Sequence, residues 1–413
     1  MGSDCSDDRQ PVATAAVALI LDAPKWRKKR GMKRLLAALG ADEGLTRYVG
    51  GAVRDDLLGL PVNDIDLATR IPPDEVIARL EKAKIKAVPT GIDHGTVTAV
   101  SDGHPFEITT LRRDVSTDGR RATVAFTDDW QEDAARRDFT INALSADPQT
   151  GELFDYFGSL ADLQNRHIRF IGDPLQRIAE DHLRILRFFR FHARFDAGEA
   201  DAAAVDACSQ RANDLMALSR ERIADELLKL LGLPDPSRTV GIMLERGILK
   251  PVLPEIGPDA GHALRSLIAA EAAADVAPDG LRRLAALLPR DADTAGEIAV
   301  RLRLSNKARK RLGCAACTGG GSPRTLAYRL GTECAVDRLL LAGDAAAARE
   351  VGEWRVPRLP TSGGALIKRG LPEGPVVART LRAIEDRWVA AEFPSGEAFQ
   401  RMVDDALAEA VAS

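Results

Sequence analysis

The segment 48–66 brings together side chains suited to chemistry on a phosphate. Gly50 and Gly51 follow a short apolar run and open an expected helix, so backbone N–H groups can approach an anion with no Cβ in the way. Arg54 lies one turn into that helix, within reach of the same anion. We interpret these three residues as a candidate nucleotide-binding turn.

Two carboxylates follow in the same segment. Asp64 and Asp66 flank Ile65 in an expected strand, where side chains alternate, so both carboxylates project from one face. Magnesium prefers oxygen ligands and keeps substrate phosphates in its shell. An isolated Asp-x-Asp is more often a solvated strand end, but the glycine pair and arginine upstream favour catalysis. The sequence therefore predicts Mg²⁺ as cofactor, with Asp64 and Asp66 as its catalytic ligands.

This segment resembles the head-domain signature of the class II tRNA nucleotidyltransferase (CCA-adding enzyme) and bacterial poly(A) polymerase family. The similarity continues in order through residues 94–98, 106–112, 136–143 and 180–187. It covers the chain from about residue 30 to about residue 230. The resemblance implies an α+β protein, in which a nucleotidyltransferase-type α/β head is followed by all-α neck, body and tail regions.

Three further head residues are candidates. Glu107 lies on an expected strand beside the metal pair, where a third carboxylate could accept a proton or complete the metal shell. The alternative is a strand-exposed glutamate. Arg137 and Asp138 resemble the family's ribose-recognising motif, and together they could orient a ribose hydroxyl and a phosphate, although such ion pairs are often structural.

A second constellation carries Asp181, Arg184, Arg187 and Arg190 on one expected helix, whose apolar face begins at Ile185. Cytosine and adenine share an edge with an amino donor beside a ring-nitrogen acceptor. Aspartate only accepts and arginine only donates, so Asp181 and Arg184 could read C and A and reject U and G. Arg187 and Arg190 could reach the base or the triphosphate. The alternative is a solvated helix face, and the match to the family's protein-template motif favours nucleotide binding.

The segment 112–121 is polar, charged and contains glycine, so it reads as a mobile loop beside the site. The family resemblance assigns a flexible loop at this place a role in adding the final A. The segment therefore favours complete CCA addition.

The resemblance implies, and periodicity and breaks agree with, the following regions: an irregular or disordered leader 1–24, a head 25–160, a neck 161–230 that recognises the base, and a tRNA-binding body and tail 231–413. Within the head we expect a helix at 31–40, strands near 46–49, 64–68 and 85–89, and a hairpin over 96–110 that turns at 101–104. Helix breaks are expected at 234–236, 257–258 and 319–323.

Composition sets limits on function. The 413 residues are 45% hydrophobic and 29% charged, and no run approaches a membrane span. Although the net charge is −4, basic residues concentrate in 166–194 and 301–311, which could contact a phosphate backbone. Solvated helix faces remain an equal alternative for 301–311.

The cysteines bear on location. Five cysteines are scattered and odd in number, so we expect no disulfide framework and a reducing cytoplasm. Cys314 and Cys317 form a lone pair that cannot close a tetrahedral zinc site, and we interpret them as core residues.

These observations predict a template-independent nucleotidyltransferase that uses CTP and ATP on the 3′ end of tRNA by two-metal chemistry, with no membrane or protein partner implied. A poly(A) polymerase or A-adding enzyme of the same family is the main alternative, but residues 88–95 lack the arginine-rich signature typical of those enzymes. A noncatalytic RNA-binding protein is the other, and intact Asp64 and Asp66 argue against it.

Overall fold

The computed structural model describes residues 20–21, 25–118, 121–195 and 197–412. Most of the expected leader 1–24 lies outside this range, but Ile20 bridges to Glu152 and Leu21 is buried, with its backbone N donating to Gly151 O at 2.8 Å. Contacts divide the chain into two compact units. The head unit comprises Met1–Arg184 and Phe195–Arg211, and the helical unit comprises Ile185–Arg194 and Ala212–Ser413. The expected borders at 160 and 230 stay predictions.

The main sheet of the head unit has the order β3-β4-β5-β2-β1-β8-β9. Only the β2–β5 pair is parallel among the pairs of this sheet in the described residues. The hairpin expected over 96–110 is confirmed, with side chains that alternate between buried and more exposed positions along β4. Strands also form near 46–49 and 85–89, whereas the strand expected at 64–68 begins only at Asp66. The strands are β1 (Thr46–Val49), β2 (Asp66–Thr69), β3 (Lys86–Gly91), β4 (Thr96–Ser101), β5 (His104–Thr110), β8 (Ser145–Ala146) and β9 (Leu153–Phe154).

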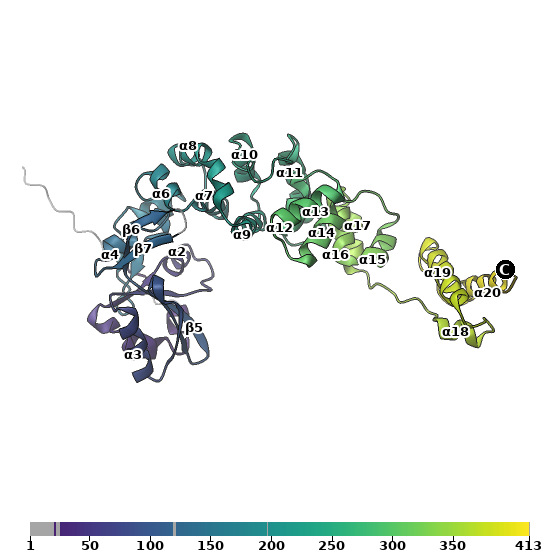
Figure 1. The fold of residues 1–413 in the computed structure, drawn as a ribbon, viewed down its shortest axis with the longest axis horizontal. Helices are drawn as coiled ribbons and strands as arrows, with labels where there is room; N and C mark the ends of the chain where they lie inside the picture. The colour runs from purple at the N-terminus through teal and green to yellow at the C-terminus, as the bar shows by residue number, and fades with distance from the viewer. Residues whose placement is uncertain (1–19, 22–24, 119–120, 196, 413) are drawn as a thin grey trace, which may run out of the picture. The chain divides into compact units, whose positions relative to one another are not determined.

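The head unit also contains short helices, among them α2, α3 and α4 (Figure 1). Met32 and Leu35 of the first helix are fully buried, which confirms the helix expected at 31–40. The helices are α1 (Met32–Ala38), α2 (Gly51–Leu57), α3 (Pro73–Lys82), α4 (Trp130–Ala135), α5 (Ser159–Gln164), α6 (Pro174–Glu180) and α8 (Ala202–Gln210).

The expected mobile loop at 112–121 is wrong for the backbone that the structure describes. β6 (Arg112–Asp118) and β7 (Arg121–Phe126) pair antiparallel as a separate two-stranded sheet. Sequence reading emphasised the charges and overlooked β-branched residues on both sides of Asp118 and the glycine after it, a combination typical of hairpins.

Beyond α7 (Arg184–Arg194), the described elements of the helical unit are helices (Figure 1). All three expected breaks are confirmed, since they fall between α9 and α10, between α10 and α11, and between α14 and α15. The helices are α9 (Arg220–Leu231), α10 (Ser237–Glu245), α11 (Ala260–Ala274), α12 (Gly280–Leu287), α13 (Ala292–Arg301), α14 (Asn306–Ala316), α15 (Pro323–Leu330), α16 (Thr332–Leu341), α17 (Ala345–Glu353), α18 (Gly363–Lys368), α19 (Pro375–Ala390) and α20 (Gly396–Ala412).

A buried charge network joins the helices of this unit. Arg282 donates to Glu271 at 2.6 Å and to Asp337 at 2.7 Å, while Arg283 donates to the other oxygen of Glu271 at 2.9 Å. Arg311 donates to Asp337 at 2.6 Å. Burial opposes the charge of Arg311, yet hydrogen bonds to Asp337 and other acids raise its pKa. Arg311 belongs to the expected basic run 301–311, so this member serves the fold.

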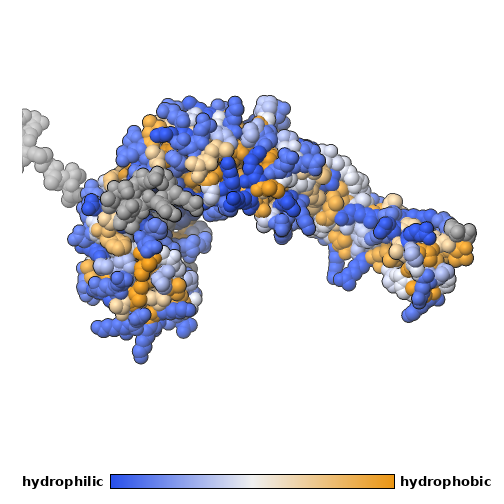
Figure 2. Space-filling view, viewed as in Figure 1, coloured by the Kyte–Doolittle hydropathy of each residue, from blue (hydrophilic) through white to orange (hydrophobic). Residues whose placement is uncertain are grey.

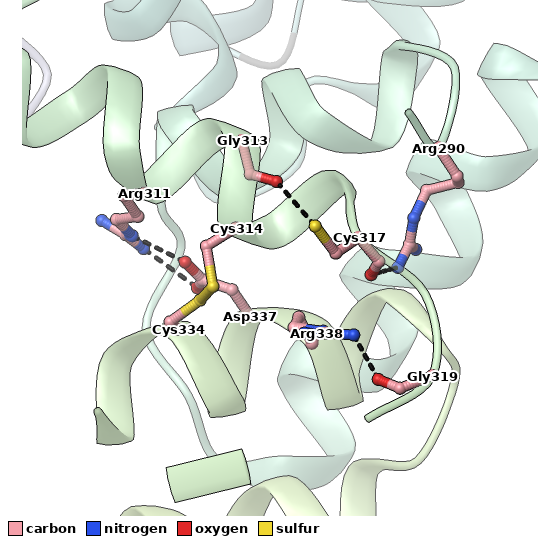
Figure 3. Close-up of a disulfide and its surroundings, with 9 residues drawn as sticks. All are labelled: Arg290, Arg311, Gly313, Cys314, Cys317, Gly319, Cys334, Asp337 and Arg338. Carbon is pink, nitrogen blue, oxygen red and sulfur yellow. Dashed lines mark hydrogen bonds and ion pairs between the residues drawn. A yellow bond between two sulfur atoms is a disulfide. The ribbon is translucent and has the colours of Figure 1, made fainter. Parts of the chain in front are cut away.

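A disulfide joins Cys314 of α14 to Cys334 of α16, with Cα atoms 6.3 Å apart (Figure 3). This corrects two expectations: the absence of disulfides and the pairing of Cys314 with Cys317 as core cysteines. Cys317 keeps a thiol that donates to Gly313 O at 3.4 Å. The sequence misled because the bonded partner lies 20 residues away, on a helix that packs against α14.

Among the described residues, no helix is both long and apolar enough to cross a membrane. On the face drawn in Figure 2, hydrophobic and hydrophilic residues are interspersed.

Candidate active site

The glycine turn forms as expected between β1 and α2. Gly50 has φ +65° and Gly51 begins the helix. A Cβ at Gly50 would lie 2.8 Å from Nη1 of Arg137, so only glycine leaves room for this guanidinium. The turn therefore places α2 against an arginine that is also a predicted nucleotide ligand.

Arg54 is buried inside the head unit. It forms an ion pair with Asp55 at 2.7 Å, and its Nη1 donates to Oδ1 of Asn142. These contacts join α2 to the turn at 140–142. Nucleotide binding by Arg54 stays a prediction. Its observed contacts, with Asp55 and Asn142, hold α2 against the 140–142 turn.

Two of the three predicted catalytic carboxylates, Asp66 and Glu107, lie on neighbouring strands, and the third, Asp64, does not lie on a strand. Asp66 is the first residue of β2, whereas Asp64 precedes the strand that we expected to include it. Ile65 is buried between them while Asp64 is exposed, so the alternation holds. Glu107 of β5 lies directly opposite Asp66 in the parallel register, as a third carboxylate beside the pair requires.

Burial and like charges act together on Asp66. Burial first and the Glu107 carboxylate second raise the pKa of Asp66 to about 6, with Asp64 adding to the rise and Arg137 opposing it. A divalent cation would relieve this repulsion, and oxygen is the ligand that magnesium prefers. No group of three or more potential ligands in the described residues is arranged to hold a metal by itself. The carboxylate oxygens of Asp64 and Asp66 match the ligand type that magnesium prefers, and magnesium binding here stays a prediction.

Arg137 and Asp138 are held by their neighbours. Arg137 donates from Nη1 to Asn142 O at 3.3 Å and from Nη2 to Asp133 at 3.4 Å. Asp138 is buried and its Oδ1 accepts from Phe139 N at 2.9 Å and from Asn142 Nδ2 at 2.8 Å. Asn142 thus contacts Arg54, Arg137 and Asp138, a hub that sequence reading left without a role.

Asp181 is not on the helix where we placed it. α6 ends at Glu180, Asp181 is extended, and α7 begins at Arg184. Its Oδ1 accepts from Leu183 N at 3.1 Å, a local bond typical of an aspartate turn. Helical periodicity across 181–192 hid this break.

Arg184 is anchored in the head unit. It donates to Glu180 at 2.5 Å, to Arg177 O at 2.9 Å and to Arg136 O at 3.2 Å. The structure therefore brings Arg184 next to the backbone of the 136–138 motif, although the two lie 48 residues apart. Base reading by Asp181 and Arg184 stays a prediction.

The other two predicted nucleotide ligands lie in the helical unit. Arg190 donates to Glu226 of α9 at 2.6 Å, and Arg187 lies 3.8 Å from the other oxygen of this carboxylate. Glu226 is buried. Sequence reading missed Glu226, because a glutamate on an amphipathic helix gives no local sign that its partners are two arginines on another helix.

Comparison with known proteins supplies the family. Residues 46–169 match the family described as Poly A polymerase head domain, and residues 201–259 match one described as Probable RNA and SrmB- binding site of polymerase A. CCA tRNA nucleotidyltransferase 1, mitochondrial, of Mus musculus is 33% identical over 391 residues, which cover 89% of this chain and 88% of the mouse protein. The chain belongs to the CCA tRNA nucleotidyltransferase family.

Other members of the family agree with this assignment. The CCA-adding enzyme of Streptococcus gordonii is 40% identical over 213 residues, 51% of each chain. The crystal structure of the Bacillus stearothermophilus CCA-adding enzyme in complex with CTP superposes with a TM-score of 0.73 at 27% identity, covering 93% of this chain and 100% of that one. The α+β head and helical remainder expected from the sequence are thereby confirmed as the fold of this family.

Proposed function

We propose that this protein transfers CMP and AMP from CTP and ATP to the 3′ end of tRNA and so completes the terminal CCA. The observation that carries the proposal is the similarity to the mouse CCA tRNA nucleotidyltransferase, which is 33% identical over 89% of this chain. The similar Bacillus stearothermophilus enzyme was solved in complex with CTP, which supports CTP as a substrate of this protein. The pairing of Asp66 on β2 with Glu107 on β5, with the charge of Asp64 acting on Asp66, supports catalysis.

Asp64 and Asp66 would hold Mg²⁺, which when bound neutralises triphosphate charge and stabilises the in-line displacement. Arg137, beside the glycine turn, binds a phosphate, and its charge already acts on Asp66. Glu107 accepts the proton of the attacking 3′-hydroxyl or completes the metal shell. Asp181 and Arg184 read the base edge, so no nucleic-acid template is required.

A cytoplasmic location remains a prediction, since the mouse and human relatives are named as mitochondrial. Fractionation of the source cells would decide it.

The test uses tRNA transcripts that end before CCA, after C and after CC, each incubated with the purified protein and one nucleoside triphosphate at a time. We expect CMP incorporation on the first two and a single AMP on the third, all dependent on Mg²⁺ and abolished by a chelator. Long A tails on unrelated RNA would identify a poly(A) polymerase. RNA binding without incorporation would identify a noncatalytic protein.

A further inference from the structure

Asp133 of α4 is a buried carboxylate, 3% exposed, to which neither sequence reading nor the proposed mechanism gives a role. Its Oδ1 accepts from Arg136 Nε at 2.8 Å and from the backbone N of Arg112 at 3.3 Å. Its Oδ2 accepts from Arg137 Nη2 at 3.4 Å. Burial opposes its charge, yet the charges of Arg136 and Arg137 hold the pKa of Asp133 below its usual range.

The two ends of this arrangement have different functions. Arg112 is the first residue of β6, at the root of the β6–β7 hairpin. This root is fastened to the catalytic strand, because Leu111 N donates to Thr69 O at the end of β2 and Thr127 N donates to Leu111 O. Arg137 is the guanidinium that packs on Gly50. Asp133 is the carboxylate that contacts both.

We propose that Asp133 is a positioning residue that couples the β6–β7 hairpin to Arg137 in the nucleotide site. One carboxylate oxygen fixes the hairpin root and the other fixes the guanidinium, so a displacement of the root reorients Arg137. Within the described residues, the guanidinium of Arg137 makes two hydrogen bonds, both long at 3.3 and 3.4 Å, which leaves its orientation sensitive to the position of Asp133. If Asp133 were only a structural ion pair, its substitution and the loss of the hairpin would act independently on nucleotide addition. The proposed coupling instead requires that the effect of the hairpin on nucleotide addition depend on Asp133.

The inference rests on the proposed function, together with the expectation from the family resemblance that segment 112–121 serves addition of the final A. It is tested by a double-mutant cycle that combines deletion of residues 114–120 with Asp133→Asn, a variant that keeps the shape of the side chain and removes its charge. The kcat and KM for ATP on tRNA ending in CC, and for CTP on tRNA lacking CCA, are measured at steady state with the enzyme limiting.

We expect the deletion to lower kcat for the final A by about tenfold or more in the wild-type background and by less than about threefold in Asp133→Asn, a coupling within the range of contacting residues. Asp162→Asn is the matched control, because Asp162 is a buried head carboxylate that accepts from Arg169 at 2.7 Å. In that background the full cost of the deletion should persist.

An equal cost of the deletion in the wild-type and Asp133→Asn backgrounds would overturn the coupling. Asp133→Glu keeps the charge but lengthens the side chain, so the cost of the deletion in this background should lie between its costs in the wild type and in Asp133→Asn. A thermal melt of each variant identifies any that is unfolded. If Asp133→Asn is unfolded, the same cycle is run with Asp133→Glu, and undiminished cost of the deletion overturns the inference. Wild-type protein that extends no tRNA would instead refute the proposed function.

Discussion

Two groups of acidic side chains receive opposite treatment in this molecule. In the helical unit, Glu271 and Asp337 are almost completely buried, and each meets two arginines at hydrogen-bonding distance. In the head unit, Asp66 has two carboxylates near it, and its pKa is raised to about 6. In the helical unit, arginines neutralise the buried Glu271 and Asp337, whereas in the head unit negative charge gathers around Asp66.

This difference separates charge that serves the fold from charge that serves a ligand. A buried acid with paired arginines stabilises one arrangement, and losing one partner leaves a strongly unfavourable charge. Mutually repelling carboxylates have no such structural benefit and are typical of functional sites. Asp66 and Asp337 should therefore respond to substitution in opposite ways.

The largest expected effect is on catalysis. Asp64→Ala or Asp66→Ala should reduce nucleotide incorporation to background, because a metal ligand is lost, while the unfolding midpoint does not fall, because repulsion is relieved. The measurements are incorporation with Mg²⁺ and a thermal melt. Near-normal turnover in either variant would refute the metal assignment.

The complementary change is in the body. Asp337→Ala should destabilise the protein by roughly 3–5 kcal/mol, because Arg282 and Arg311 lose their shared acceptor. Denaturant unfolding measures this effect. Asp225→Ala is the control, since its exposed pair with Lys229 should contribute only about 0.5 kcal/mol. Similar costs for both variants would remove the contrast between buried and exposed pairs.

The disulfide tests how much of the body's stability is covalent. Cys334→Ala should lower the unfolding midpoint of the oxidised protein, since a crosslink across a 20-residue separation contributes about 3 kcal/mol. The same variant melted with a thiol reductant should differ little from reduced wild type. A mass measurement after alkylation of the unfolded, unreduced wild type should find three of the five cysteines alkylated, and alkylation of all five would contradict the disulfide.

The smallest expected effect concerns two adjacent acids, one with a structural role and one with a predicted role in base reading. Glu180 is ion-paired with Arg177 and Arg184, whereas Asp181 follows the helix. Replacing Asp181 and Arg184 together should relax selection against UTP and GTP by about ten- to a hundredfold, the cost of mismatched polar groups. Arg54→Ala, the control, should weaken all four nucleotides alike. Unchanged exclusion of UTP and GTP with uniform loss of activity would make Asp181 and Arg184 structural.

Local pattern was enough for part of the fold and site. The glycine turn at Gly50 and the alternation around Ile65 depend on conformational rules that act over a few residues, so both could be predicted. The hairpin over 96–110 was predicted for the same reason. The position of Glu107 on a strand beside Asp66 was also expected, whereas the parallel register that sets the two residues opposite each other was not predicted.

The remaining features depend on partners distant in sequence. Nothing near Glu226 indicates its bond to Arg190, 36 residues away, and the Cys334 partner of Cys314 was obscured by the nearer Cys317. Asp181 was misplaced for another reason. Its side-chain bond to Leu183 N interrupts a helix whose apolar period continues on both sides.

The guanidinium of Arg283 reaches the end of α9, where it donates to the carbonyls of Leu231, Leu233 and Pro234. Carbonyls in the last turn of a helix have no partner within the helix, and most helix ends fray. Because Arg283 is itself held by Glu271, opening the final turn of α9 requires breaking the bonds of a buried, anchored guanidinium. The amide protons of this turn should therefore exchange with solvent more slowly than those at the exposed end of α20.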